Sequence, residues 1–318
     1  MPNLKHFDPN SHRQIKLSGK IVLITGGSAG IGKVNVRQFA ELGAKVYVIA
    51  RNKEKTLAVL DDIKAKTGNS DLFFIQADLD SLASIKNAAN EFLNKETRLH
   101  IFICNAGAST FNKPWPLDGF ETLFGQNYLS HFLLTHLLMD CLKQTANALG
   151  NVQGSVRIIN VSSEASDMFG APTSLDFASM TNNASPTADA ATNFVHPGIL
   201  AEFSLYGRSK LCQVLSTVKL AQILKDTGIS VYSLHPGVVA SNIYDPYMNR
   251  GGVFAVVLGA LNKVRAISEE QGSLTTLYCA LSNDVAGESG LFYDNCAVRK
   301  NKNKCVGDQD LVNELWTR

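Results

Sequence analysis

The chain has 318 residues and a formal net charge of +2, with 45% hydrophobic and 18% charged residues. These values are typical of an ordinary globular protein with room for one large α/β domain, and they exclude a disordered chain. So small a net charge gives no reason to expect a nucleic-acid partner.

The cysteines and the apolar runs bear on the compartment. Cysteine occurs without any C-x-x-C pair, at Cys104, Cys141, Cys212, Cys279, Cys296 and Cys305. We therefore expect a reduced, intracellular and cytoplasmic protein. The first residues lack a secretory apolar core, and no run approaches the roughly 18 residues of a membrane span. The ten mostly apolar residues Gly252 to Leu261 are interpreted as a buried or substrate-covering helix, although peripheral membrane or lipid-droplet association stays open.

After an N-terminal arm over residues 1–18, apolar runs alternate with segments of helical period. We expect strands at Ile21–Thr25, Lys45–Ile49, Leu72–Gln76, His100–Cys104, Val156–Ser162 and Ser230–His235. We expect helices ending at Leu42 and covering Lys53–Lys66, Leu82–Leu93, Leu129–Leu142 and Ser204–Lys225. This alternation predicts an α/β protein with a Rossmann-type, doubly wound parallel sheet of about seven strands and helices on both faces. No linker divides the chain, so residues 1–318 are taken as one domain.

One segment departs from this alternation. Residues 164–203 are rich in Ala, Ser, Thr, Asn and Pro and show no sustained period. Loops this long inside a domain are uncommon and are usually functional or mobile. We therefore interpret residues 164–203 as an insertion near the substrate site.

A glycine-rich turn follows the first expected strand, at Thr25-Gly26-Gly27-Ser28-Ala29-Gly30-Ile31-Gly32. Glycine lets a backbone turn tightly and approach a phosphate, and the N-terminus of the next helix favours an anion. Because the turn lies between a strand and a helix, it predicts a phosphate cradle.

A nucleoside-triphosphate site is the competing interpretation of this turn. Gly27, Gly32 and Lys33 match G-x-x-x-x-G-K, but the next residue is Val34, which lacks the hydroxyl that binds Mg²⁺. The G-x-G-x-x-G spacing is not matched either. A dinucleotide is therefore favoured over a nucleoside triphosphate.

The end of the second strand indicates which dinucleotide binds. An acidic residue there would hydrogen-bond the adenosine ribose, but this chain has Ala50 followed by Arg51. A guanidinium pairs well with phosphate, so we expect NADP(H) to be the cofactor.

Tyr206 and Lys210 are one helical turn apart and share a helix face. A free tyrosine has a pKa near 10, and a neighbouring ammonium lowers that pKa by stabilising the phenolate. The pair is thus a candidate for general acid–base catalysis. Ser163 ends a strand and could polarise a carbonyl, and a buried Asn127 could hold a relay water.

With these motifs, the sequence resembles the short-chain dehydrogenase/reductase superfamily. The resemblance rests on the glycine turn, Asp78, the Cys-Asn-Ala-Gly run at 104–107, Asn127, Ser163, the Tyr-Gly-Arg-Ser-Lys run at 206–210 and the His-Pro-Gly-Val-Val run at 235–239. Within the superfamily the chain is similar to the retinol-dehydrogenase-like and WW-domain-oxidoreductase-like branch. That branch uses NADPH and acts on lipophilic aldehydes, ketones and alcohols.

The resemblance implies a role for each matching residue. Tyr206 would be the general acid/base, Lys210 would lower its pKa and bind the nicotinamide ribose, Ser163 would orient the substrate oxygen, and Asn127 would anchor a relay water. The residues implied to bind the cofactor are Gly26, Ser28, Ala29, Gly30, Ile31, Gly32, Arg51, Asp78, Leu79, Asn105, Ala106, Gly107, Tyr206, Lys210, Pro236, Gly237, Val239 and Ser241. No metal site is expected.

The chain departs from the family pattern at three places. Cys104 replaces a frequent Asn, and Ser241 stands where Thr is common. Ser163 and Tyr206 are 43 positions apart, far more than is usual in the superfamily, which leaves Ser162 as an alternative to Ser163. It also suggests a substrate pocket shaped by residues 168–197.

We therefore expect an NADPH-dependent carbonyl reductase, or ketoreductase, that transfers hydride between the cofactor and a lipophilic carbonyl or alcohol. A non-catalytic NADPH-binding sensor or interaction protein is the alternative. A homodimer through the two long helices, Leu129–Leu142 and Ser204–Lys225, stays open. The basic run Arg299–Lys304 is interpreted as a solvated loop in preference to a contact with an acidic membrane.

Overall fold

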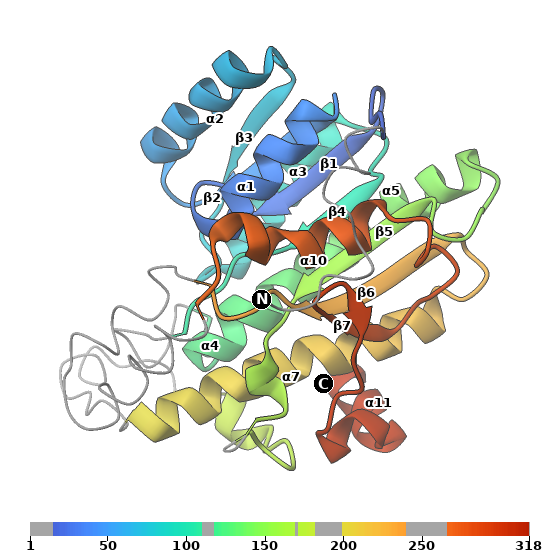
Figure 1. Ribbon diagram of the computed structural model, residues 1–318. Helices are drawn as coiled ribbons and strands as arrows, with labels where there is room; N and C mark the ends of the chain where they lie inside the picture. Colours follow the sequence, from blue (N-terminus) through green and yellow to red (C-terminus); the bar gives the residue numbers. More distant parts are fainter. Residues whose placement is uncertain (1–14, 110–117, 169–170, 182–198, 240–265, 318) are drawn as a thin grey trace.

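Strands and helices alternate along the chain from Ile21 onward (Figure 1). The computed structural model describes residues 15–109, 118–168, 171–181, 199–239 and 266–317. The strands are β1 (Ile21–Thr25), β2 (Lys45–Ala50), β3 (Leu72–Gln76), β4 (Ile101–Cys104), β5 (Val156–Val161), β6 (Ile229–His235), β7 (Leu291–Asp294) and β8 (Ala297–Val298). The main helices are α1 (Gly30–Glu41), α2 (Lys53–Thr67), α3 (Leu82–Lys95), α4 (Thr122–Phe124), α5 (Ser130–Ala148), α7 (Ile199–Ile223), α10 (Glu269–Leu281) and α11 (Gln309–Thr317).

The strands form one sheet in the order β3-β2-β1-β4-β5-β6-β7-β8. All neighbouring pairs are parallel except β7 and β8. The chain moves outward from β1 to β3 and then returns to place β4 on the other side of β1. In an open sheet of this kind, ligands bind at such a reversal, beyond the carboxyl ends of the strands. The topology therefore places a binding crevice beyond the ends of β1 and β4.

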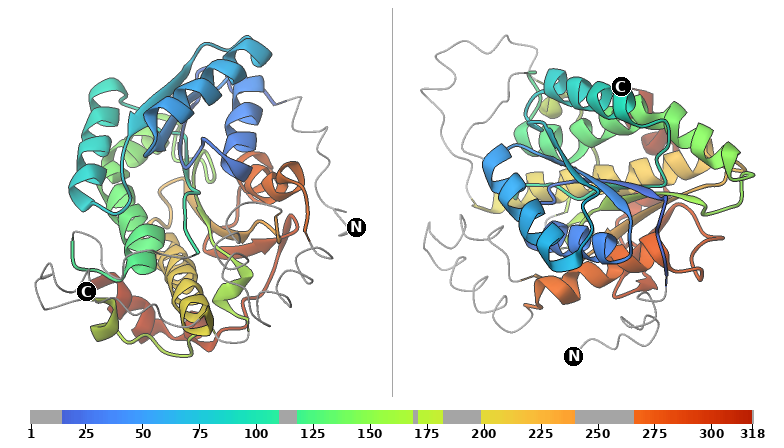
Figure 2. Two further views of the ribbon diagram at one scale, coloured as in Figure 1. Left: turned by 90° about the vertical axis from the view of Figure 1, so that its left-hand side faces the viewer. Right: turned by 90° about the horizontal axis from the view of Figure 1, so that it is seen from above.

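The two faces of the sheet are covered by different helices, as Figure 2 shows from the side and from above. In β1 every side chain is buried, because parallel strands are covered on both faces. Val22 and Ile24 pack into one core with Phe39 of α1 and residues of α2 and α10. Ile21 and Leu23 point to the opposite face and pack into a second core with residues of α3, α5 and α7. The predicted doubly wound arrangement is confirmed.

The structure differs from the expectation in several elements. The sheet has an eighth strand, the two-residue antiparallel β8, where about seven were expected. Helix α7 begins at Ile199, five residues earlier than predicted, so it takes in the end of the 164–203 segment. Helices α10 and α11 and strand β7 were not foreseen. Three parts of the sequence that were interpreted above lie outside the described residues: the apolar run from Gly252 to Leu261, residues 1–14 of the N-terminal arm, and residues 182–198 of the insertion.

The C-terminal helix α11 packs onto α7, one of the two helices considered for a homodimer. Lys219 of α7 donates a hydrogen bond of 2.7 Å to Asn313 of α11. Trp316 of α11 meets Phe132 of α5 edge-on, with ring centroids 5.0 Å apart. Within the described part of the chain, no helix is both long and apolar enough to cross a membrane.

All six cysteines are free thiols and are buried, as expected for a chain without structural disulfides. Burial raises the pKa of the Cys104 thiol to about 12 and that of Cys141 to about 11. These two groups are therefore neutral near pH 7 and pack as small apolar side chains. In the described residues there is also no group of His, Cys, Asp and Glu side chains that could hold a metal ion.

Candidate active site at the carboxyl edge of the sheet

A cavity of about 570 Å³ lies beyond the carboxyl ends of β1, β4 and β5, at the place that the topology indicates. A second cavity of about 320 Å³ adjoins it beyond β2 and β3 and shares Gly26, Ser28, Arg51, Lys55, Ala106 and Gly107 with it. Together they form one long site. The predicted cofactor residues that line it are Gly26, Ser28, Ala29, Gly30, Ile31, Gly32, Arg51, Asp78, Leu79, Asn105, Ala106, Gly107, Tyr206, Lys210 and Pro236.

The shape of the glycine turn depends on three glycines, two of them through their φ angles and one through lack of space for a side chain. Gly26 and Gly30 have positive φ angles of 71° and 56°, which L side chains rarely adopt. A Cβ on Gly32 would lie 2.3 Å from the main-chain oxygen of Gly26 and 2.6 Å from the amide nitrogen of Asn105. The turn can therefore close tightly only with glycine at these places.

Helix α1 starts in this turn with its N-terminus open to the cavity. Its N-cap residue, Ala29, makes no side-chain capping hydrogen bond, and the first turn carries no acidic residue. The first N–H groups of a helix lack intrahelical partners and carry partial positive charge. This end of α1 is suited to bind a phosphate group.

The loop after β4 is bound tightly to the end of β1. The Thr25 hydroxyl oxygen accepts hydrogen bonds from the main-chain N–H groups of Asn105 (3.0 Å) and Ala106 (2.9 Å). The Asn105 amide donates in return to the main-chain oxygens of Thr25 and Gly26. Asn105 thus joins the loop after β4 to the end of β1, and it also lines the cavity.

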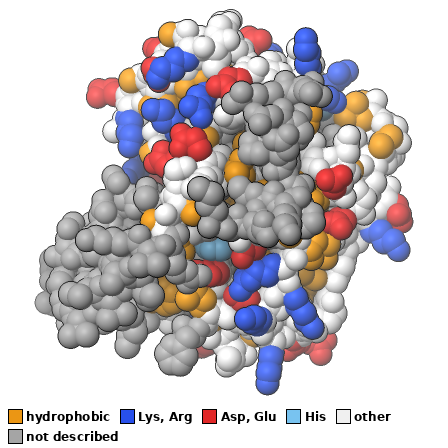
Figure 3. Space-filling view, viewed as in Figure 1, with side chains coloured by type: hydrophobic (Ala, Val, Ile, Leu, Met, Phe, Trp, Pro, Cys, Tyr) orange, Lys and Arg blue, Asp and Glu red, His pale blue; other side chains and the backbone are white. Residues whose placement is uncertain are grey.

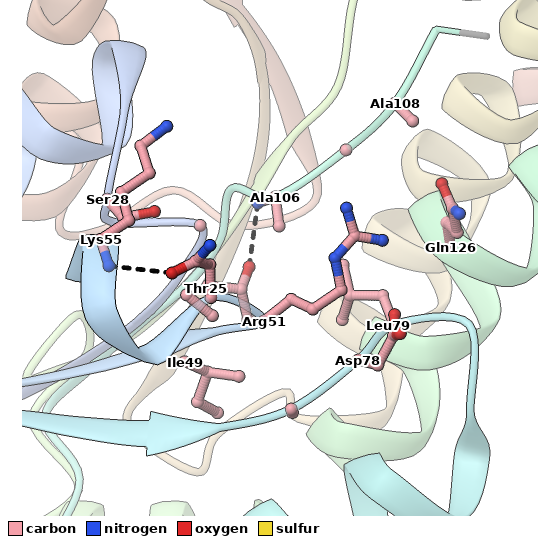
Figure 4. Close-up of a pocket in the computed structure, with 15 residues that line it drawn as sticks. Thr25, Ser28, Ile49, Arg51, Lys55, Asp78, Leu79, Ala106, Ala108 and Gln126 are labelled. Carbon is pink, nitrogen blue, oxygen red and sulfur yellow. Dashed lines mark hydrogen bonds between the residues drawn. The ribbon is translucent and has the colours of Figure 1, made fainter. Parts of the chain in front are cut away.

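Basic, neutral polar and apolar side chains and one carboxylate, that of Asp78, line the second cavity (Figure 4). The exposed side chain of Arg51 follows the end of β2 and reaches toward Asp78 and Leu79, which follow β3. Lys55, one turn along in α2, lines both cavities. It was missed in the sequence, although its place four residues after Arg51 on the expected helix could have revealed it. Neither cation forms an ion pair with any described residue.

Tyr206 and Lys210 line the larger cavity from helix α7, and both are buried, with exposed fractions of 6% and 3%. The Lys210 ammonium nitrogen lies 5.7 Å from the centre of the Tyr206 ring. The predicted pair is therefore brought together at the cavity wall. Leu123 and Ala165 pack with Tyr206 in a small apolar cluster of buried residues.

Lys210 is bound by neutral acceptors only. Its ammonium donates to the main-chain oxygen of Val161 (2.9 Å) and to the side-chain oxygen of Gln213 (3.1 Å). No described carboxylate forms an ion pair with it. Because burial disfavours the charged form, the pKa of Lys210 falls to about 7. The amine is therefore poised to change charge near neutral pH, which is a property of functional lysines.

The two serines after β5 point to different partners. The Ser162 hydroxyl donates to the main-chain oxygen of Lys210 (2.8 Å). The Ser163 hydroxyl oxygen accepts from the main-chain N–H of Ala165 (3.2 Å), so it caps a short 3-10 turn at Glu164–Ser166. No described residue accepts a hydrogen bond from the Ser163 hydroxyl. Ser162 lines the larger cavity, whereas Ser163 is not among the residues that line it.

Asn127 lies in a π-helical turn, Gly125–Leu129, just before α5. Its side-chain oxygen accepts from the main-chain N–H of Ala108 (2.8 Å), and its amide donates to the main-chain oxygen of Ala108 and the hydroxyl of Ser209. The fully buried amide thus joins the β4 loop to α7. Gly107 is needed beside it, since a Cβ there would lie 3.0 Å from the Asn127 side-chain oxygen.

The segment after β6 completes the boundary of the site. Pro236 lines the larger cavity. Gly237 has a φ of 89°, and Val239 pairs with Ile267 in an isolated parallel bridge; neither lines the cavities. Ser241, also predicted to bind the cofactor, lies outside the described residues.

The described parts of the 164–203 segment are attached to the rest of the protein. Arg208 of α7 forms a buried ion pair of 3.2 Å with Glu121 and donates to the hydroxyl of Ser179 (2.7 Å). Thr181 forms an isolated bridge with Phe120. The segment therefore packs next to the helix that carries Tyr206, although only part of residues 168–197 is described.

Residues 299–304 hold the other end of this segment. The carboxylate of Asp167 accepts from Arg299 (3.0 Å) and from the main-chain N–H of Lys302 (2.8 Å). The side chains of Asn301 and Asn303 donate to Ser166. Lys300, Lys302 and Lys304 alternate with these asparagines and are exposed, and basic side chains gather on the lower part of the face in Figure 3. The solvated interpretation of this run fits its exposed lysines.

Comparison with known proteins agrees with this geometry. Residues 20–178 match the family model described as short chain dehydrogenase. Retinol dehydrogenase 12 of Mus musculus is 36% identical over 89% of this chain and 79% of its own length. Retinol dehydrogenase 11 of Homo sapiens is 34% identical over 89% of this chain and 80% of its own. The RhlG/NADP active-site complex of Pseudomonas aeruginosa shares the fold, with a TM-score of 0.63 and 24% identity, covering 87% of this chain and 94% of that one.

Proposed function

The chain belongs to the short-chain dehydrogenase family and is an NAD(P)-dependent oxidoreductase, and from this premise we propose that it is an NADPH-dependent carbonyl reductase. The substrate would be a lipophilic ketone or aldehyde, or the corresponding alcohol in the reverse direction. Tyr206 would be the general acid/base. The observation that carries the proposal is the placement of Tyr206 and Lys210 in the wall of the cavity that the glycine turn borders.

The residues present fit a dinucleotide. The glycine turn and the open N-terminus of α1 would hold the pyrophosphate, since the glycines let the turn close and the first N–H groups of α1 lack partners in the helix. Asp78 and Leu79 would contact the adenine, and Asn105 with Gly107 would line the rest of the site. When bound, the cofactor supplies the hydride that passes to or from the substrate carbon.

The charges near the end of β2 support NADPH over NADH. Arg51 and Lys55 both line the cavity, and no carboxylate follows the strand. A carboxylate would bind the two ribose hydroxyls of NADH, whereas two cations would bind the 2′-phosphate that only NADPH carries. Both side chains are exposed and make no ion pair with a described residue, so a phosphate would not have to displace an acidic partner.

Tyr206 and Lys210 would together supply the proton. In reduction the phenol donates its proton to the substrate oxygen, and the ammonium of Lys210 stabilises the phenolate that is left. Lys210 has three N–H groups and uses two of them with Val161 and Gln213. The third would be available to the nicotinamide ribose.

Ser163 would hold the substrate oxygen. Its oxygen accepts from Ala165, which fixes the side chain and leaves its O–H to be donated to a substrate. The Ser162 hydroxyl is already used as a donor to Lys210. This difference favours Ser163 over Ser162.

A lipophilic substrate is supported by the surroundings of Tyr206. Five apolar side chains pack around or beside Tyr206, namely those of Leu123, Ala165, Ala108, Phe203 and Leu205. Two relatives are named for retinol, a lipophilic alcohol.

For assembly, a dimer through α5 and α7 would have to accommodate α11, which already packs on them. We keep the expectation of one intracellular domain, which the six free thiols support.

The test is turnover with a panel of lipophilic aldehydes and ketones, followed by the loss of NADPH absorbance. Tyr206→Phe removes the proton donor and keeps the ring, so we expect turnover to fall by a factor of at least about 100. NADPH binding, measured by fluorescence titration, should change by less than about threefold. A Phe variant with full activity would refute the proposal. The non-catalytic alternative would be favoured if the wild-type protein bound NADPH and reduced none of the panel.

A further inference from the structure

The side chain of Gln213 connects Lys210 to the main chain of Asn127. Gln213 lies on α7 three residues after Lys210 and is buried, with 2% of its surface exposed. Its side-chain oxygen accepts from the Lys210 ammonium (3.1 Å), and its side-chain N–H donates to the main-chain oxygen of Asn127 (2.8 Å). One amide thus contacts both groups, and each end of it has a partner.

The Asn127 oxygen is in turn held by His131. The distance from the ring nitrogen Nδ1 of His131 to this oxygen is 3.0 Å, and a carbonyl can only accept, so Nδ1 must carry the proton. Burial lowers the pKa of His131 to about 4, which keeps the ring neutral at physiological pH. In the neutral ring the other nitrogen, Nε2, is therefore an acceptor.

Nε2 of His131 lies 2.8 Å from the hydroxyl oxygen of Thr25, which must donate to it. The same hydroxyl oxygen accepts from the N–H groups of Asn105 and Ala106. All three of its hydrogen-bonding positions are then used. An unbroken hydrogen-bonded chain runs from the cofactor cradle through Thr25, His131, the Asn127 carbonyl and Gln213 to Lys210.

We propose that Gln213 is a positioning residue that fixes the Lys210 ammonium by joining it to the main-chain carbonyl of Asn127. This role rests on the proposed function, because the role of Lys210 in the reaction is itself part of that proposal. A carboxamide accepts at oxygen and donates at nitrogen, but it passes no proton along unless it forms an unfavourable imidic acid. The Gln213 amide therefore holds the ammonium in place and does not itself carry a proton.

The charged and titratable groups near Lys210 determine how the proposal can be tested. They are Tyr206 on its own helix, Cys104 on β4 and His131 on α5. Burial keeps Cys104 and His131 neutral near pH 7. The Gln213 oxygen is thus a main source of stabilisation for the ammonium, together with the Val161 carbonyl.

The experiment compares Gln213→Leu with Gln213→Glu. Leucine removes both hydrogen bonds, so the pKa of Lys210 should fall and the alkaline limb of the reductive kcat profile should move to lower pH. Glutamate keeps the length of the side chain, loses the donor to the Asn127 oxygen and adds a negative charge beside the amine, so the same limb should move to higher pH. For Leu we also expect kcat to fall on the order of tenfold. Opposite shifts are an effect that a merely structural role would not produce.

Gln222→Leu is the matched control, because Gln222 is an exposed residue of the same helix whose amide bonds Gln309. It should leave kcat and the pH profile unchanged. A second readout needs no turnover: the pKa of Lys210 is followed in the cofactor-free protein by NMR of ¹³C-labelled lysine, with Lys210→Met to assign the signal. It should fall in the Leu variant and rise in the Glu variant.

Unchanged pKa values and pH profiles in both variants, or shifts in the same direction, would overturn the role of Gln213. If the Leu variant does not fold, Gln213→Met takes its place, because methionine keeps the length of the side chain and lacks both hydrogen-bonding groups, and the pKa of Lys210 should again fall. Failure of the proposed function looks different, since the wild-type protein would then reduce no carbonyl while the NMR shifts would still report on Gln213.

Discussion

Ser162 donates a hydrogen bond of 2.8 Å to the main-chain oxygen of Lys210, so the end of β5 is joined directly to the turn of α7 that carries the Lys210 amine. This bond explains how two adjacent serines can have different roles. Ser162 supports the helix, whereas Ser163 keeps its hydroxyl hydrogen for another acceptor. The assignment of the substrate-orienting role to Ser163 can be tested from this difference.

We expect Ser163→Ala to lower kcat by a factor of about 100 to 1,000, as the loss of one donor to a reacting oxygen does. Its melting temperature should stay close to that of the wild type. Ser162→Ala should instead lower stability by about 1 kcal/mol and kcat by less than about threefold. Steady-state kinetics and thermal unfolding measure both effects. A larger loss of kcat in the Ser162 variant would reverse the assignment.

The coenzyme preference should depend on Arg51 and Lys55. Without Arg51 the 2′-phosphate loses a charged partner, so we expect Arg51→Ala to raise the Kd for NADPH roughly tenfold and to leave the Kd for NADH nearly unchanged. Lys55→Ala should act in the same direction with a smaller effect, because an ammonium is a single point charge. Fluorescence titration with both coenzymes measures this.

Lys53→Ala is the matched control, since Lys53 begins the same helix but does not line the cavities. It should change neither Kd. Equal losses for NADPH and NADH in the Arg51 variant would show that the arginine binds something common to both coenzymes and not the 2′-phosphate.

The fold was largely predictable because its strands are short apolar runs followed by glycine or polar residues, and the central strands β1, β4, β5 and β6 are buried on both faces. Strand β1 ends at Thr25, just before the turn that has to approach a phosphate, and the predicted position was correct. Helix α10 was missed because almost all of its residues are buried, which hides a helical period. Its capping box, with Ser268 and Gln271 bonded to each other's main chain, was the signal that could have revealed it.

The candidate site was predictable only where its residues follow strand ends or share a helix face. Tyr206 and Lys210 were found because they are one turn apart. Gln213 is on the same face, but its importance comes from the Asn127 carbonyl, which is 86 positions away in the sequence. The packing of Glu121 against Arg208 is another long-range contact that no local pattern reveals.

The pKa of Lys210 predicts how stability depends on pH in the cofactor-free protein. The pKa is about 7 in the folded state and 10.5 as the reference value, so between these pH values the unfolded chain binds more protons than the folded one. The free energy of unfolding therefore receives a contribution from Lys210 that is fully present above about pH 10.5 and is lost as the pH falls toward 7.

Lys210→Met removes this contribution. Relative to the wild type, the variant should be more stable at pH 7 than it is at pH 9.5, whatever its absolute stability. Urea unfolding of both proteins at the two pH values, without cofactor, checks this. Because the cysteines and tyrosines are the same in both proteins, their titration largely cancels in the difference. A difference that does not vary with pH would contradict the lowered pKa.

The ion pair between Arg208 and Glu121 should be important for holding the start of α4 against α7. Both side chains are buried, with exposed fractions of 9% and 6%, and Glu121 also accepts from the main-chain N–H groups of Leu123 and Phe124. Arg208→Met would leave the Glu121 carboxylate buried without its cation, at a cost of about 3–5 kcal/mol of stability. Glu121→Gln should cost less than Arg208→Met, since an amide keeps an oxygen for the helix N-terminus and loses the charge.

If the two side chains stabilise one another, the double variant should lose less stability than the two single changes added together, and urea unfolding of the four proteins measures that coupling. Additive losses would show that Arg208 acts through its bond to Ser179 and its packing, independently of Glu121.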